Sequence, residues 1–344
     1  MRAFARSALA VAALVACALA PSPAHADTPP SVWDRAKDPT LTESYRLHVE
    51  VQRRLAVLDR PDPPRYDLAD SQLRTVRVLL ERYNAGASKD PRLRFDLGLV
   101  YSELEEYDKA AKVLTSVLAD FPDHPSAERG WLRLAMACGH TGDHDCEQKA
   151  YGQVLREATD EISRATPTLN LAETEMHLGN LREAIEGYRE ALRIAGRVPM
   201  RETAPLAVWG LAVALDRSGD RPGAEKEARF ARELERSMGL PNLLHTRGVF
   251  FVPSYEVHWY DALGASAQAK QATTPLEIVR LWRSAEQSFA SYVRFAGIAK
   301  EKDRWLELAK LRLAATRAER EKAEKKYGKE PPREPEDDER ELTR

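Results

Sequence analysis

The feature that most constrains the fold of this chain is a small residue that recurs at nearly equal intervals, each time directly after a leucine. It occurs four times, with spacings of 37, 37 and 40 residues, as Gly98, Ala135, Ala172 and Ala212. Apolar residues around each one recur every three to four positions, the period of a helix with one buried face. In the last three segments a Gly-Asp or Gly-Asn pair follows the small residue seven positions later. The pattern predicts repeated pairs of helices, each pair joined by a tight turn.

The segment from Leu171 to Ala195 shows such a pair most clearly. Its second half places Ala184, Tyr188 and Ala191 on one helical face. Small side chains let two helix backbones approach each other, and the tyrosine fills the space beside them. One pair cannot bury its apolar face alone, so we expect neighbouring pairs to stack into a continuous core.

The four segments resemble the tetratricopeptide (TPR) repeat. Its template has a small residue about eight positions in, alanine near position twenty and an aromatic residue about four positions later. The first segment supplies Gly98, Ala110 and Leu114 at these places. The observed spacing exceeds the usual TPR period of about 34, and we attribute the excess to longer turns at residues 158–166 and 196–203.

The resemblance implies a fold class that is all-α, a right-handed α-solenoid of stacked TPR-like helical hairpins. Prolines, composition and charge divide the rest of the chain around the repeats. The predicted organisation is a signal peptide (1–26), a flexible lead-in (27–40), an N-terminal helical hairpin that is either a degenerate repeat or a cap (41–84), four TPR-like repeats (91–236), a connector (237–254), a fifth degenerate repeat with a capping helix (255–326) and a disordered charged tail (327–344).

The first 26 residues have the pattern of a secretory signal peptide. Arg2 and Arg6 precede an apolar run, and Ala24-His25-Ala26 offers small residues at a cleavage site. The run is shorter than the roughly 20 residues that span a membrane. In a second interpretation, residues 14–17 form a lipobox and Cys17 carries a lipid that anchors the chain to a membrane. Both interpretations predict an exported protein without a transmembrane segment, periplasmic or associated with the outer membrane of a Gram-negative bacterium.

Two cysteines, Cys138 and Cys146, bracket the turn of the second repeat. In an oxidising compartment they can pair as a disulfide, and closing this short loop would contribute roughly 2.5 kcal/mol in the chain-entropy model. Alternatively they remain separate thiols, with Cys138 a small buried residue. In a third interpretation they bind Zn²⁺ or copper together with His140 and His144, although their spacing matches no established metal motif.

In TPR arrays the first helix of each pair lines a concave groove, so the resemblance places a ligand there. Methionine and aromatic residues at these positions suit an adaptable peptide-binding surface. The alternative is that the same residues form core, covered by a neighbouring helix or by the N-terminal segment. The groove positions, with His140 in the same register, are Arg92, Phe95, Leu99, Arg129, Leu132, Met136, Leu169, Glu173, Met176, His177, Trp209, Val213 and Arg217.

Composition and motifs exclude several classes of function. The formal net charge is only −2, so electrostatics gives no reason to expect nucleic acid as the partner. The chain has no Gly-rich phosphate loop, GxSxG or HExxH motif, and we expect neither enzymatic activity nor a cofactor. The leading hypothesis is an exported scaffold that binds a peptide or protein segment, from an envelope protein, in envelope assembly or maintenance. The alternatives are a metal-handling periplasmic protein that uses the Cys138–Cys146 turn, and a non-catalytic subunit of an enzyme.

Overall fold

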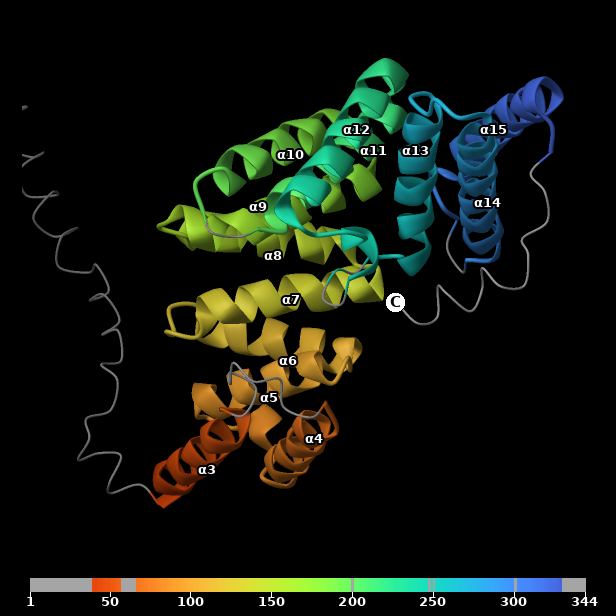
Figure 1. Ribbon diagram of the computed structural model, residues 1–344. Helices are drawn as coiled ribbons and strands as arrows, with labels where there is room; N and C mark the ends of the chain where they lie inside the picture. The colour runs from red at the N-terminus through yellow and green to blue at the C-terminus, as the bar shows by residue number, and fades with distance from the viewer. Residues whose placement is uncertain are drawn as a thin grey trace, which may run out of the picture. The chain divides into compact units, whose positions relative to one another are not determined.

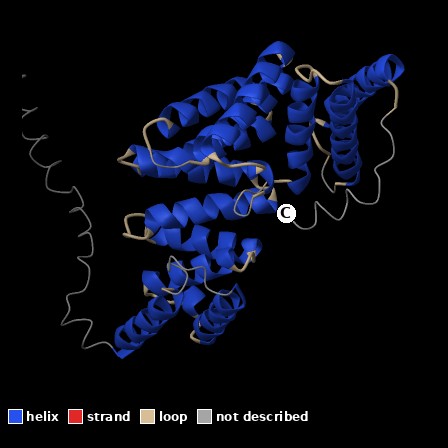
Figure 2. Ribbon diagram, in the orientation of Figure 1, coloured by secondary structure: helices blue, strands red, loops and turns tan. Residues whose placement is uncertain are grey.

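The computed structural model describes residues 39–56, 66–198, 201–246, 249, 251–299 and 302–329 (Figure 1). All regular secondary structure in these ranges is helical (Figure 2). The predicted signal peptide with Cys17, nearly all of the lead-in and the tail beyond residue 329 lie outside the described residues.

The chain divides into two compact units, residues 1–60 and residues 61–344. In the N-terminal unit, α3 (Pro39–Leu55) is the described helix, and its Ser44, Val51 and Leu55 side chains are buried. The second helix of the predicted 41–84 hairpin, α4 (Tyr66–Arg82), belongs to the other unit. We therefore describe the two units separately.

The larger unit is a succession of helices in which each helix from α4 to α15 packs on the next one in the sequence. The elements after α4 are η1 (Ala85–Ala87), α5 (Pro91–Glu103), α6 (Tyr107–Asp120), α7 (Ala127–Thr141), α8 (His144–Glu157), α9 (Glu161–Leu178), α10 (Leu181–Ala195), α11 (Thr203–Ser218), α12 (Arg221–Met238), η2 (Leu243–His245), η3 (Ser254–Glu256), α13 (Val257–Ala269), α14 (Pro275–Ile298) and α15 (Leu306–Tyr327).

The first helices of successive hairpins also contact one another, as a solenoid requires. Such contacts join α5 to α7, α9 to α11 and α11 to α13. The α7–α9 pair is packed less closely than these pairs, and a cavity opens beside both helices.

The recurring small residues and glycines produce these hairpins for simple steric reasons. A Cβ atom at Gly98 would lie 2.6 Å from a methyl carbon of Leu114, so α5 and α6 can approach closely only because that side chain is absent. The equivalent Ala135, Ala172 and Ala212 are fully buried. Three hairpin turns end their first helix with a glycine at positive φ, which glycine adopts at no steric cost: Gly142, Gly179 and Gly219. The predicted fold class, an all-α solenoid of TPR-like hairpins, is confirmed.

One predicted turn is wrong. Residues 158–166 were expected to form a long turn, but α9 begins at Glu161, where the Asp160 carboxylate accepts a hydrogen bond from the Ser163 backbone N–H. The helix then continues through Pro167, which is buried inside it. Proline lacks the N–H that a helix interior uses, so α9 forgoes one backbone hydrogen bond at this position. The extra length of this repeat therefore lies in the helix.

Beyond the repeats, α13, α14 and α15 pack in sequence on α12. The charged α15 joins α14 through ion pairs, with Arg283 to Glu324 at 2.6 Å and Arg317 to Glu286 at 2.8 Å. Its Ala323 side chain is buried against Trp282 and its neighbours. Most of the outward side chains of α15 are exposed, which is the arrangement expected of a terminal helix in a solenoid.

Candidate functional site

A cavity of about 400 Å³ lies between α7, α8, α9 and α11, and the connector that follows α12 forms one of its walls. We call it the cleft. Its volume is within the range of small ligand sites in proteins. The lining residues come from the second, third and fourth repeats, the connector and α13: Met136, Gly139, His144, Glu147, Tyr151, Thr166, Leu169, Asn170, Glu173, His177, Tyr188, Glu202, Thr203, Leu206, Gly210, Leu243, Thr246, Val249, Phe251, Val252 and Tyr260.

One side of the cleft is apolar. Met136, Leu169 and Leu206 face it from three first helices of the repeats. The connector adds Phe251 and Val252, and the Phe251 ring lies 4.9 Å from the ring of Tyr260, between centroids. Phe251 therefore contacts α13 and also lines the cleft beside Leu206 of the fourth repeat.

The other side carries two carboxylates and two imidazoles. His144 Nδ1 lies 2.8 Å from Glu147 Oε2, and the His144 and His177 rings stack with centroids 5.4 Å apart. His177 Nε2 lies 3.8 Å from Glu173 Oε1, which is too long for a hydrogen bond. The four side chains thus form a connected charged group that spans α8 and α9.

Burial and these neighbours shift the pKa values of Glu173 and His177. Burial raises the pKa of the Glu173 carboxyl, and the nearby imidazole of His177 opposes that shift. Burial lowers the pKa of His177, but the close approach of Glu173 and the negative charge of Glu256 outweigh it, so its pKa is raised overall. Both groups therefore hold a proton more tightly than they would in water.

Two buried polar atoms at the cleft have no hydrogen-bond partner among the described residues. They are the Tyr188 hydroxyl and Nε2 of His177. The side chain of His177 is only 9% exposed, and Tyr188 is 2% exposed. Tyr151 differs, because its hydroxyl accepts a hydrogen bond of 2.9 Å from the side-chain amide of Asn170. Unpaired buried polar atoms are costly in a protein interior, and Tyr260, which also lines the cleft, is the side chain that influences the Tyr188 hydroxyl.

The predicted groove residues separate into three sets. Four line the cleft, namely Met136, Leu169, Glu173 and His177. Five are interior: Phe95, Met176, Trp209, Val213 and Arg217. The remaining Arg92, Leu99, Arg129 and Leu132 do not line the cleft.

For the interior set, the structure favours the alternative that these residues are core. Trp209 is fully buried and its indole N–H donates a hydrogen bond of 2.8 Å to Glu235. Arg217 is buried and pairs with Glu256 at 2.6 Å. What covers this part of the array is its own C-terminal helices, because Arg217 also lies over the rings of Trp259 and Trp305.

Several residues that line the cleft were not predicted from the sequence. Glu147 and Tyr151 belong to a second helix, which the groove register does not include, and Phe251 and Val252 belong to the connector. The apolar run 249–252, in an otherwise irregular segment, was the available signal for the last two. The sequence contained no signal for Glu147 or Tyr151 apart from their position on the hairpin.

The contacts between hairpins decide the type of repeat. Tyr188 of α10, the template aromatic, packs directly against Gly210 of the next first helix, where an added Cβ would lie 2.1 Å from its ring. The template alanines Ala110, Ala184 and Ala224 are fully buried. The hairpins are TPR-like repeats.

The TPR-like array is similar in fold to several solved structures. One is residues 41 to the end of MamA from Desulfovibrio magneticus RS-1, with 16% identity, a TM-score of 0.44 and coverage of 58% of this chain and 97% of that one. Another is a tetratricopeptide repeat protein from Parabacteroides merdae, with 14% identity, a TM-score of 0.44 and coverage of 79% of this chain and 99% of that one. No protein-family model and no curated protein matches the chain. The assignment of the repeats therefore rests on their own geometry.

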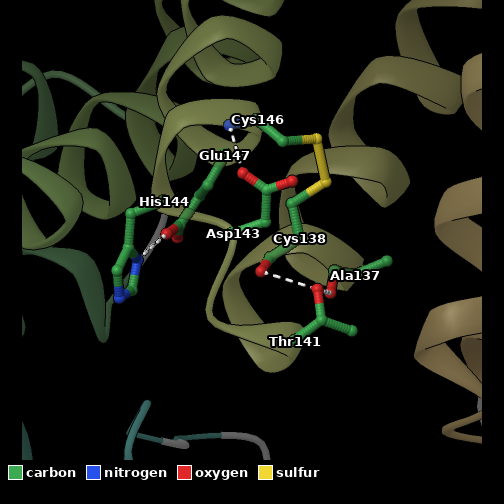
Figure 3. The surroundings of a disulfide bond; sticks show 7 residues. All are labelled: Ala137, Cys138, Thr141, Asp143, His144, Cys146 and Glu147. Atoms are coloured by element: carbon green, nitrogen blue, oxygen red, sulfur yellow. Dashed lines mark hydrogen bonds and ion pairs between the residues drawn. A yellow bond between two sulfur atoms is a disulfide. The ribbon is translucent and has the colours of Figure 1, made fainter. Parts of the chain in front are cut away.

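Cys138 of α7 and Cys146 of α8 form a disulfide across the turn of the second TPR-like repeat (Figure 3). His144 points away from the two sulfur atoms and toward Glu147 (Figure 3), while the His140 ring stacks on Tyr107 at 3.9 Å. Within the described part of the chain, no group of three or more His, Cys, Asp or Glu side chains is arranged to hold a metal ion. The proposed four-residue metal set is thus not brought together.

None of the helices in the described ranges combines the length and the hydrophobicity that a membrane-spanning segment needs.

Proposed function

We propose that this protein is a non-catalytic scaffold that binds a peptide segment of a partner protein in the cleft. The observation that carries the proposal is the cleft itself, a partly apolar cavity whose walls come from three successive repeats and the connector. A site that draws its walls from several repeats suits an extended ligand, because each repeat can contact a different residue of it.

The apolar wall supplies the contacts that such a ligand needs. Met136 and Leu169 are partly exposed in the cleft, and methionine adapts its shape to different side chains. Leu206 and Phe251 extend the same wall. The anchor of the ligand would be an apolar or amphipathic side chain inserted between these residues.

We further propose that the protein is exported and works in the envelope of a Gram-negative bacterium, in assembly or maintenance. The signal-peptide pattern of residues 1–26 supports this. The Cys138–Cys146 disulfide supports it independently, because disulfides persist in oxidising compartments and are rare in the cytosol.

Site-specific photo-crosslinking in the host cell tests the proposed function. Leu169→benzoylphenylalanine places the reactive group at the cleft wall, and Glu128→benzoylphenylalanine places it at an exposed position of α7 outside the cleft. We expect a discrete adduct with a partner polypeptide from position 169 and none from position 128. Equal labelling at the two positions, or no adduct at position 169, would show that the cleft does not hold a protein partner.

A second variant separates binding from misfolding. Met136→Ala combined with Leu169→Ala shortens the apolar wall without touching the buried Trp209. We expect the double variant to keep the helical circular dichroism spectrum of the wild type and to lose recovery of the crosslinked partner in pull-down.

A further inference from the structure

Carboxylates outnumber imidazoles in the lining of the cleft, by three to two. Its lining residues include Glu147, Glu173 and Glu202, and no lysine or arginine. The arginine whose charge acts on His177, Arg217, is fully buried and is paired with Glu256 at 2.6 Å. A negative potential in a partly closed, low-dielectric cavity attracts a cation more strongly than it would at an open surface.

Of Glu147 and Glu173, Glu173 is the carboxylate with the weaker ion pair inside the protein. It is 28% exposed and faces the cleft, and its ion-pair contact among the described residues is His177 at 3.8 Å. Glu147, by contrast, is already paired with His144 at 2.8 Å. A carboxylate that is largely buried without a donor loses much of its hydration without compensation, so a bound donor with positive charge would restore the missing interaction.

The neighbouring polar atoms also fit a cationic donor. The Tyr188 hydroxyl oxygen lacks a hydrogen-bond partner among the described residues, and it can accept a hydrogen bond. The rings of Tyr188 and Tyr260 line the same cavity, and aromatic faces attract cations.

The apolar wall matches the remainder of a basic side chain. Lysine and arginine carry three or four methylene groups before the charged end, and these pack on apolar surface while the charged end reaches a polar partner. In the cleft, Met136, Leu169 and Phe251 supply that surface and Glu173 lies beyond Leu169 on the same helix.

We propose that the cleft selects a lysine or arginine side chain of the bound peptide, with Glu173 as its ion-pair partner and with the Tyr188 hydroxyl oxygen accepting a further hydrogen bond. This proposal rests on the proposed function and names the chemistry of the ligand. Glu147 would contribute negative charge without contacting the basic side chain directly, because its carboxylate is already paired with His144.

Peptide arrays test the proposal with the purified full chain. Each short sequence is present in versions that differ at one central position, which is arginine, lysine, norleucine or glutamate. We expect the arginine and lysine versions to bind about ten-fold more tightly than the norleucine version, as a charge-assisted hydrogen bond implies, and the glutamate version to bind most weakly.

Glu173→Gln is the decisive variant, since it keeps the size of the side chain and removes its charge. We expect it to reduce the preference for arginine and lysine over norleucine to less than about two-fold, with no loss of norleucine binding. Glu128→Gln, at an exposed position on α7, is the matched control and should keep the full preference.

The outcomes distinguish this proposal from the proposed function. Binding of peptides that is blocked by Met136→Ala with Leu169→Ala, but shows no preference for basic residues, would overturn the present proposal and leave the scaffold function intact. Absence of binding by every peptide would overturn both. Arginine amide alone, added as competitor, should bind far more weakly than the peptides; if it binds as tightly, the occupant is a small cationic molecule and the proposal of a partner side chain is wrong.

Discussion

Gly210 of α11 lies against the ring of Tyr188 of α10, and this contact sets the distance between the third and fourth repeats. A Cβ atom at Gly210 would be 2.1 Å from Cε1 of that ring. Tyr188 is fully buried and has little freedom to move in a densely packed interior. We therefore expect Gly210→Ala to lower the free energy of unfolding by about 1–3 kcal/mol, measured by urea denaturation.

The matched control is Gly152→Ala in α8. An added methyl group there would meet only the end of the Arg156 side chain, at 3.6 Å. Alanine is the better helix former, so this variant should be more stable than the wild type by roughly 0.5–1 kcal/mol. If the two variants change stability in the same direction, the contact with Tyr188 is not what fixes the repeat spacing.

The raised pKa of His177 predicts a pH dependence of stability. Because the folded protein holds this proton more tightly than the unfolded chain does, the stabilisation is complete below the ordinary value of 6.5 and is lost as the pH rises through the higher folded value. The stability difference between wild type and His177→Gln should therefore be larger at about pH 6 than at about pH 8. The unfolding free energy of both proteins at the two pH values measures it.

His140→Gln is the control of opposite sign. Burial lowers the pKa of His140, against the weaker influence of Glu105 and Glu147. Its folded form therefore resists protonation, and the advantage of wild type over this variant should shrink as the pH falls toward 6. Parallel behaviour of the two histidine variants would contradict the assigned directions.

At the scale of elements, the disulfide between α7 and α8 holds the turn of the second repeat. Closing this loop should stabilise the protein by about 2.5 kcal/mol through the entropy of the unfolded chain. We expect a thiol reductant to lower the free energy of unfolding of the wild type by about that amount. Cys138→Ala with Cys146→Ala should not respond to the reductant. A wild-type protein that is fully reduced by thiol titration, yet unchanged in stability, would contradict the expectation.

The sequence predicted the hairpin turns best, because glycine is the residue that most readily adopts the backbone conformation these turns require. The turn glycines Gly142, Gly179 and Gly219 all adopt positive φ, and few other residues do so without strain. The predicted turn at 158–166 failed because residues in excess of the TPR period can lengthen a helix as well as a turn, as they do in α9. Pro167 is buried within α9, and the packing of a residue against distant segments is not visible in a linear pattern.

The cleft was only partly predictable for a related reason. Met136, Leu169, Glu173 and His177 were found because they follow the register of the first helices. The same register also selected Trp209, which is fully buried. The sequence of the fourth repeat alone does not indicate that helices later in the chain cover its inner face. Burial of that face depends on contacts between segments far apart in the sequence, for example Arg217 with Glu256 and Tyr292.

At the scale of the whole 61–344 unit, a buried polar network joins the repeats to the C-terminal helices. Arg217 of α11 donates to Glu256 of η3 at 2.6 Å, and the Tyr292 hydroxyl of α14 lies 3.1 Å from the same carboxylate. The Tyr292 hydroxyl also reaches Asp303 at 3.1 Å. Because Arg217 is the ion-pair partner of the buried Glu256 in this network, loss of its charge should affect the helices that the network connects.

Arg217→Ala would leave Glu256 buried without its ion-pair partner, which typically costs about 3–5 kcal/mol. We expect the loss to appear in hydrogen exchange as faster exchange across α13, α14 and α15, with less change in α5 and α6, because repeats distant from the network depend mainly on their neighbours.

Arg217→Met combined with Glu256→Gln removes both charges while keeping volume, so it should destabilise less than the single change. Arg221→Ala, at an exposed position of α12, is the control and should leave exchange unchanged. Uniformly faster exchange from α5 to α15 in Arg217→Ala would show instead that the whole unit unfolds as one.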